Sequence, residues 1–283
     1  MTDIVKTSQG RESGHWYDKN GHLIELVTGA KGQHLKPDLS HARKLDLAPG
    51  VTTILKMAAA PGLEIWKQNK VLMSALTTTR FPSETDEAFI WRIKAEAAAE
   101  ARAAAEAGTA LHAEIERGIA GGEKSPLAQV AIDKLVDLVG AVNAPWHAER
   151  GAVSTCGYGT KSDACLAGGL FTDHSWIIDW KGTEKPLSEL KTFKDHARQL
   201  AATRMGLTQS VDPAFYNARC AIGYVRRDYK ERDIKPTSAI KLIEVGQDEL
   251  TKGWLCFYHL LQLWQIDNDY RPSWATDWRD NDD

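Results

Sequence analysis

Residues 175–182 read SWIIDWKG, and the predicted fold is worked out from this segment. Its apolar residues are typical of a buried strand. Side chains alternate along a strand, so Asp179 and Lys181 project from one face while Ile178 and Trp180 project from the other. A carboxylate and an ammonium group at the end of an apolar strand are costly to desolvate unless they serve a site. The stretch therefore predicts a central strand that carries chemistry.

A second strand candidate, KSDACL at 161–166, precedes this one and connects to it through Ala167, Gly168 and Gly169. A hairpin-like pairing of the two brings the carboxylate of Asp163 near that of Asp179. Two neighbouring carboxylates repel each other, and the usual resolution is a hard divalent cation with oxygen ligands, Mg²⁺ or Mn²⁺. We therefore expect a divalent cation between these strands.

Two helical segments add further polar groups. In GTALHAEIE, at 108–116, His112 and Glu116 are four residues apart and share a helix face, which offers another ligand and a further acid. In HARQLAAT, at 196–203, Gln199 follows the Asp-Trp-Lys strand by about one helix and could orient a phosphate or the lysine. Glu149 is another candidate acid, and the sequence alone leaves its role and that of Glu116 open.

Around these segments the hydrophobic period predicts helices before and after a block of mixed strands, the pattern of an α/β domain. Gly108 interrupts the Ala-rich helix that Ser83 begins, and Thr109 is the expected cap of a new segment. The N-terminus predicts a hairpin that turns at Asn20-Gly21, then an irregular basic arm. The helices are expected at 63–76, 83–107, 109–120, 125–149, 193–204 and 247–265, and the strands at 151–159, 161–169, 175–182, 218–227 and 239–245.

Composition narrows the class of protein. The chain has 283 residues, with 35 Lys and Arg against 38 Asp and Glu, so a globally basic nucleic-acid coat is excluded. No apolar run is long enough for a membrane span, and the first residues predict no signal peptide. The four cysteines fit no metal-binding spacing, so we expect reduced thiols that fill the core of a cytoplasmic protein.

Four motifs in this order resemble the PD-(D/E)XK nuclease superfamily, in particular the RecB-type branch that includes phage recombination exonucleases and the mitochondrial genome-maintenance exonuclease. The matching segments are GTALHAEIE, GYGTKSDAC at 157–165, IIDWKG at 177–182 and HARQLAAT. The match covers about residues 105–205, and residues 1–60 resemble the arm of phage-encoded members more weakly. The resemblance implies a restriction-endonuclease-like α/β core, a central mixed β-sheet flanked by helices.

The resemblance also implies roles for single residues. His112, Asp163 and Asp179, with the backbone carbonyl of Trp180, would hold Mg²⁺, for which Mn²⁺ would substitute. Lys181 would position or activate the attacking water. Gln199 would be the glutamine of the family's QxxxY motif, although Thr203 stands where the family has tyrosine. Four basic side chains beside the site are the candidates for DNA contact, Lys191, Lys194, Arg198 and Arg204.

The sequence thus predicts three parts: an N-terminal hairpin and basic arm at 1–60, a nuclease core with preceding helices at 61–265, and an acidic tail at 266–283. The expected activity is a Mg²⁺-dependent exonuclease that degrades DNA from an end in phage-type recombination or repair. Expected partners are DNA, a single-strand annealing or single-strand binding protein, and other copies of the chain, in the host cytoplasm if a phage encodes it. No membrane is expected.

Alternatives remain at three points. Glu189 and Lys191 have the same spacing as Asp179 and Lys181, but their segment contains Pro186 and charges, so we favour Asp179 and Lys181. An endonuclease of the same superfamily, or an inert nuclease-like DNA-binding subunit, would share the motifs. Cleavage polarity, strand preference, DNA against RNA, the number of metals and the oligomeric state do not follow from these residues.

Overall fold

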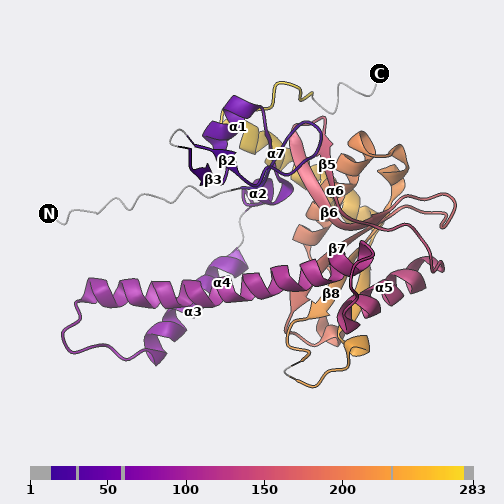
Figure 1. Ribbon diagram of the computed structural model, residues 1–283. Helices are drawn as coiled ribbons and strands as arrows, with labels where there is room; N and C mark the ends of the chain where they lie inside the picture. Colours follow the sequence, from indigo (N-terminus) through magenta and orange to yellow (C-terminus); the bar gives the residue numbers. More distant parts are fainter. Residues whose placement is uncertain (1–13, 30–31, 59–60, 231, 277–283) are drawn as a thin grey trace.

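A computed structural model describes residues 14–29, 32–58, 61–230 and 232–276. The chain forms a five-stranded sheet with helices on both sides, which confirms the predicted α/β class (Figure 1). Its helices are α1 (Leu39–Leu45), α2 (Val51–Leu55), α3 (Pro61–Thr77), α4 (Asp86–Ile119), α5 (Pro126–Val139), α6 (Lys194–Ser210) and α7 (Gln247–Asp267), with single 3₁₀ turns η1 (Leu187–Glu189), η2 (Pro213–Asn217) and η3 (Pro236–Ser238).

The sheet is mixed, with strand order β5-β6-β7-β8-β9, and β7 and β8 are its parallel pair. The N-terminal region has two short antiparallel pairings, β1 (Trp16–Tyr17) with β4 (Ala48–Pro49) and β2 (Val27–Thr28) with β3 (His34–Leu35). The strands of the main sheet are β5 (His147–Ser154), β6 (Tyr158–Leu166), β7 (Trp176–Thr183), β8 (Arg219–Arg226) and β9 (Ile240–Val245).

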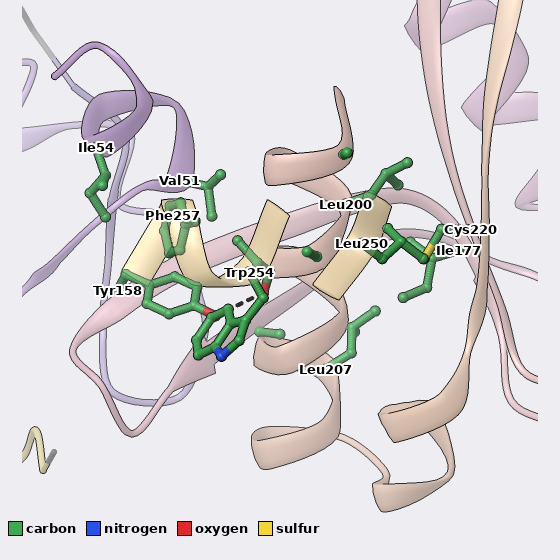
Figure 2. Close-up of a cluster of buried hydrophobic side chains, with 14 of the residues drawn as sticks. Val51, Ile54, Tyr158, Ile177, Leu200, Leu207, Cys220, Leu250, Trp254 and Phe257 are labelled. Carbon is green, nitrogen blue, oxygen red and sulfur yellow. Dashed lines mark hydrogen bonds between the residues drawn. The ribbon is translucent and has the colours of Figure 1, made fainter. Parts of the chain in front are cut away.

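Alternation along β7 divides the core into two layers. Ile178 and Trp180 pack with α5 and the C-terminal half of α4 on one face of the sheet. Ile177 packs on the other face with α6, α7 and α2, in the cluster that Figure 2 shows around Trp254 and Phe257. This arrangement confirms the two-face prediction for the central strand. Asp179 and Lys181 consequently lie on the α6 side of the sheet.

A close approach of two strands fixes Trp180 in its layer. Trp180 is fully buried and stands beside Gly223 of β8, its partner in the parallel register. A Cβ atom on Gly223 would come within 2.1 Å of the Trp180 ring, so only glycine leaves room for the indole. The buried Trp180 ring therefore fixes the position of this part of β7.

Three predictions about the helices α4 and α5 are wrong. The helix α4 runs unbroken through Gly108, and its N-cap is Thr85 rather than Ser83. A glycine inside a helix costs only about 1 kcal/mol relative to alanine, which the flanking Ala-rich turns offset. The helix predicted at 125–149 ends at Gly140, whose φ of 70° is the left-handed conformation of a helix C-cap. Glu149 thus belongs to a strand.

The turn between the two strands predicted at 151–159 and 161–169 lies a few residues earlier in the structure than predicted. The turn lies at Thr155–Gly157, and β6 begins at Tyr158. Gly157 has a φ of 89°, which a tight turn needs. The three other strands and the last helix were predicted within a few residues.

The N-terminal segment differs from the expected hairpin and arm. The turn at Asn20-Gly21 is present, but the returning chain makes one bridge, Leu23 to Tyr17, and β1 pairs instead with β4. The expected irregular arm contains α1, which Asp38 caps. Trp16 from this segment contacts Trp264 of α7 edge to face, so the N-terminal segment shares a core with the rest of the chain. The division into three domains stays a prediction.

The described part of the acidic tail packs against the N-terminal segment. The Tyr270 hydroxyl donates to the carbonyls of Ala42 and Leu47, and the Ser273 hydroxyl donates to the carboxylate of Asp46. None of the helices in the described part of the chain combines the length and apolar character that crossing a bilayer requires. Three cysteines are buried as expected, but Cys256 is exposed, so the prediction of a core role is wrong there.

Candidate metal centre

The strands β6 and β7 separate where the two acids stand. Their ladder consists of three pairs and stops at Ala164 and Ile178, whereas β7 stays paired with β8 as far as Thr183. Beyond the last pair, the Trp180 backbone N–H donates to Asp163 Oδ2 at 2.7 Å. A side chain thus replaces the missing strand partner, because a buried amide needs an acceptor. The ladder thus ends beside both acids, and this point between β6 and β7 is called the gap below.

Helix α4 places His112 and Glu116 at this gap. One ligand atom each of His112, Glu116 and Asp163 lies within 4.8 Å of the others, and His112 Nδ1 is 3.8 Å from Asp163 Oδ2. The His112 ring also makes a hydrogen bond to the backbone of Trp180. The four-residue spacing on α4 directs both side chains to the same side of the helix. Glu116, which the sequence left open, thus belongs to this group.

On the α6 side, Lys181 is held between two partners. Its Nζ lies 2.7 Å from Asp179 Oδ2 and donates to Gln199 Oε1 at 3.2 Å. Gln199 Nε2 in turn donates to Asp179 Oδ1 at 2.8 Å. Asp179 is buried, and all three side chains therefore have restricted freedom. The fixed arrangement positions an ammonium group at the edge of the gap.

Burial and like charge shape the protonation of the acids. Burial, and then the charge of Asp179, raises the pKa of Asp163 to about 8. Burial, and then the charge of Glu149, raises the pKa of Glu116 to about 7. Burial disfavours the Lys181 ammonium, but the Asp179 carboxylate outweighs this effect and raises the pKa of Lys181. Burial lowers the pKa of His112, which leaves a neutral ring available as a ligand.

These groups fit a divalent cation. Burial and a neighbouring carboxylate raise the pKa of both acids, and a cation bound beside them would offset that cost. Carboxylate oxygens and one imidazole nitrogen suit Mg²⁺ or Mn²⁺, the latter more readily when histidine takes part. Of the predicted ligands, His112 and Asp163 are in this group, while Asp179 contacts Lys181 and Gln199 instead. The cation itself stays a prediction.

Glu149 borders the group from β5. It forms an ion pair with Lys161 of β6, and a hydrogen bond to Glu116 also affects its protonation. Its backbone φ is 53°, an uncommon conformation for a glutamate. The sequence left the role of Glu149 open, and in the structure Glu149 is a neighbour of Glu116.

Other predicted residues lie in varied positions. The rival pair is not on a strand: Glu189 ends the exposed turn η1, and Lys191 is exposed after it. Lys194 and Arg198 line a groove of about 450 Å³ between α6 and α7. Arg204 donates to Gln247 Oε1 at 2.7 Å on the α7 side, so it does not reach the gap. Lys191, Lys194 and Arg198 remain candidates for DNA contact beside the site.

Thr203, which stands where the resemblance would place a tyrosine, is buried under the sheet. Its hydroxyl shares a hydrogen bond of 2.7 Å with the hydroxyl of Thr160 on β6. This contact holds α6 against the sheet. Stability rather than DNA contact is its evident role.

We expect different effects from Thr203→Val and Gln199→Leu. Thr203→Val leaves the Thr160 hydroxyl unpaired in the core and should lower the free energy of unfolding by about 1–3 kcal/mol with normal activity per folded molecule. Gln199→Leu removes the contacts to Lys181 and Asp179 and should reduce activity by more than it reduces stability. Urea unfolding and cleavage assays on both variants separate the two roles. Equal losses of activity would contradict this assignment.

Sequence reasoning overlooked two residues near Lys181. The Tyr224 hydroxyl donates to the Lys191 carbonyl at 2.9 Å and lies 3.2 Å from His196 Nδ1. Burial, and then the charge of Lys181, lowers the pKa of His196. His196 was visible as a residue one turn before Gln199, whereas Tyr224 is found only from the register of β7 and β8.

Comparisons with known proteins give little further information. No protein-family model and no curated protein matches the chain. A solved structure described as "Crystal structure of SSO0001" aligns with 75% of this chain and 88% of its own, at 15% sequence identity and a TM-score of 0.28. A similarity at this level carries no inference about function.

Proposed function

We propose that the protein is a divalent-metal-dependent deoxyribonuclease that degrades DNA from an end, of the kind used in phage recombination or repair. The observation that carries the proposal is the convergence of His112, Glu116 and Asp163 beside the linked Asp179, Lys181 and Gln199. The same residues carry the resemblance to PD-(D/E)XK nucleases, and a mixed sheet between helices is compatible with a restriction-endonuclease-like core. The first line of support is the position of these side chains in the structure, and the second is the resemblance in sequence together with the topology of the sheet.

The acids and His112 would hold the cation, together with the Trp180 carbonyl. When bound, a divalent cation supplies positive charge for the phosphodiester and lowers the pKa of water. Asp163 is the pivotal ligand because it also accepts the Trp180 N–H, which fixes its orientation. His112 is oriented by its hydrogen bond to the backbone of Trp180.

Lys181 would stabilise the negative charge that develops on the phosphate. Because its pKa is raised, its ammonium group stays protonated at neutral pH and cannot accept a proton from water. Of the two roles that the resemblance implies, positioning is therefore favoured over activation. Gln199 and Asp179 hold the ammonium group in place, which avoids reorganisation during the reaction.

We expect cation binding to release protons. Asp163 and Glu116, with pKa values of about 8 and 7, are both largely protonated at pH 6 in the absence of the cation, and both must be ionised to act as ligands. The affinity for Mn²⁺ should therefore rise between pH 6 and 8. Calorimetry in two buffers with different ionisation enthalpies measures the proton release directly. An affinity independent of pH over this range would contradict the assignment.

The decisive test of the function is digestion of end-labelled single-stranded and double-stranded DNA in Mg²⁺, Mn²⁺ and EDTA. We expect release of nucleotides from linear DNA with a cation and none in EDTA. Substrates with blocked ends and covalently closed circles serve as controls. Cleavage of closed circles would identify an endonuclease, and binding without cleavage under every condition would identify an inert DNA-binding subunit.

A further inference from the structure

Helix α3 has an apolar stripe that faces solvent. Ile65, Leu72 and Leu76 follow the spacing of a single helix face, with Trp66 and Met73 beside them. These five side chains, called the α3 stripe below, are between 46% and 81% exposed. The opposite side of α3, with Val71 and Ser74, is the partly buried one. An amphipathic helix normally turns its apolar face inward, so this orientation is the reverse of what a monomer favours.

The contact of α3 with α4 explains the orientation. The Thr78 hydroxyl, just after α3, donates to Glu96 Oε2 at 2.7 Å, and Ile93 and Ala97 are the buried side chains on this part of α4. Figure 1 shows α3 crossing the half of α4 that projects away from the sheet. The stripe thus lies on α3 beside the projecting half of α4, and no element of the described chain covers these five side chains.

The sequence of the terminal segments offers no apolar face that complements the stripe. The terminal segments outside the described residues read MTDIVKTSQGRES and DWRDNDD, and both are predominantly polar in sequence. Neither contains an apolar face that matches five large side chains. Within the described residues the stripe is therefore available to another molecule.

We propose that the α3 stripe binds the α3 stripe of a second copy of this chain. Each exposed side chain can bury about 100 Å², so the stripe contributes about 500 Å² of apolar surface per copy. A standard interface buries about 800 Å² per partner, of which about 60% is apolar, so the stripe has the size that a stable dimer needs. A contiguous exposed apolar patch of several hundred Å² is often functional.

The character of the stripe favours a symmetric partner. Between Ile65 and Leu72 its one polar position is Asn69, an uncharged amide that both donates and accepts hydrogen bonds. An amide at such a position in paired helices fixes the register by bonding to its counterpart. The charged residues Glu64 and Lys67 bond to each other outside the stripe, so two copies meet without opposing like charges there.

The length of α4 separates this interface from the candidate metal centre. His112 follows Ile93 by 19 residues on the same helix, which corresponds to about 28 Å. Two copies joined through α3 would therefore leave both metal centres accessible. The dimer and the proposed nuclease activity are independent properties, and each can be tested without the other.

Sedimentation velocity of the full chain at micromolar concentration tests the proposal. We expect twice the 31.3 kDa mass of one chain for the native protein, and the mass of one chain for the double variant Leu72→Glu, Leu76→Glu. The matched control is Leu170→Glu, because Leu170 is 92% exposed in the connection between β6 and β7, and it should remain a dimer. Circular dichroism establishes that each variant is folded. A monomeric native protein, or a double variant that remains dimeric, would overturn the proposal.

Cross-linking provides a second measurement that needs no disruptive substitution. In a Cys256→Ser background, which removes the exposed thiol, Asn69→Cys should form a disulfide-linked dimer on mild oxidation. Leu170→Cys in the same background should stay monomeric on a denaturing gel. Equal cross-linking of the two variants, or none at position 69, counts against pairing through α3.

Discussion

Asp163→Asn should abolish cleavage and, in EDTA, make the protein more stable. The asparagine side chain can still accept the Trp180 N–H, but it removes a charge from the group that would hold the cation. Loss of the cation's stabilisation, worth several kcal/mol in the transition state, lowers the rate by about 10³-fold or more. Mn²⁺ binding should be lost in parallel.

The gain in stability follows from the raised pKa of Asp163. Its pKa is about 8 in the folded protein and 3.8 in the reference state, so the folded protein binds a proton that the unfolded chain has already lost between these values. As the pH rises through this window, the folded state loses stability relative to the unfolded state, by at most about 1.4 kcal/mol per pH unit. The substitution removes this penalty, which amounts to several kcal/mol at pH 8.

Thermal melts in EDTA at pH 5 and pH 8 measure the effect. We expect Asp163→Asn to melt roughly 5–10 °C above the native protein at pH 8, and the difference to shrink at pH 5. Asp173→Asn is the matched control, because Asp173 is exposed in the connection between β6 and β7. If Asp163→Asn melts below the native protein at both pH values, its carboxyl group is not under the electrostatic strain described above.

Lys181→Met should lower cleavage by about 10²–10³-fold while the cation still binds. The loss corresponds to removing one preorganised group that stabilises developing charge. Mn²⁺ affinity should be kept or improve, because a positive charge near Asp163 and Asp179 is removed. This combination of lost cleavage and retained binding distinguishes Lys181 from Asp163. Cleavage rates under saturating Mn²⁺ and calorimetric titration provide the two readouts.

The rival pair supplies the controls for Lys181. Glu189→Gln and Lys191→Met alter residues that are exposed and lie outside the sheet. Glu189→Gln should retain full cleavage, and Lys191→Met should lose no more than a phosphate contact contributes. If these two substitutions abolish cleavage while Lys181→Met does not, the chemistry resides at the rival pair.

The central part of the fold and site could be predicted because it depends on local patterns. Alternation along SWIIDWKG was sufficient to put Asp179 and Lys181 on one face, where they form an ion pair. The spacing of His112 and Glu116 was sufficient to place them on one helix face. In both cases the relevant neighbours are two or four residues apart, so the backbone period alone determines their relation.

The errors concern properties that depend on distant parts of the chain. Gly108 was expected to end a helix because its local propensity is low, but Ile115 and Leu111 beyond it pack against α5 and extend α4. Glu149 was assigned to a helix because the capping role of Gly140 was overlooked. The separation of β6 from β7 has no local sequence pattern, and it is what makes Glu116 rather than Asp179 the third member of the group with His112 and Asp163.

This separation also gives the protein a built-in reporter. At Trp180, a carboxylate occupies the place that a neighbouring strand's carbonyl holds in an ordinary ladder. The strength of that one hydrogen bond changes with the charge on Asp163, whereas the amides along the β7 and β8 ladder bond to carbonyls that never titrate. The exchange rate of the Trp180 amide hydrogen therefore records the protonation or cation loading of Asp163, a side chain that is itself difficult to observe.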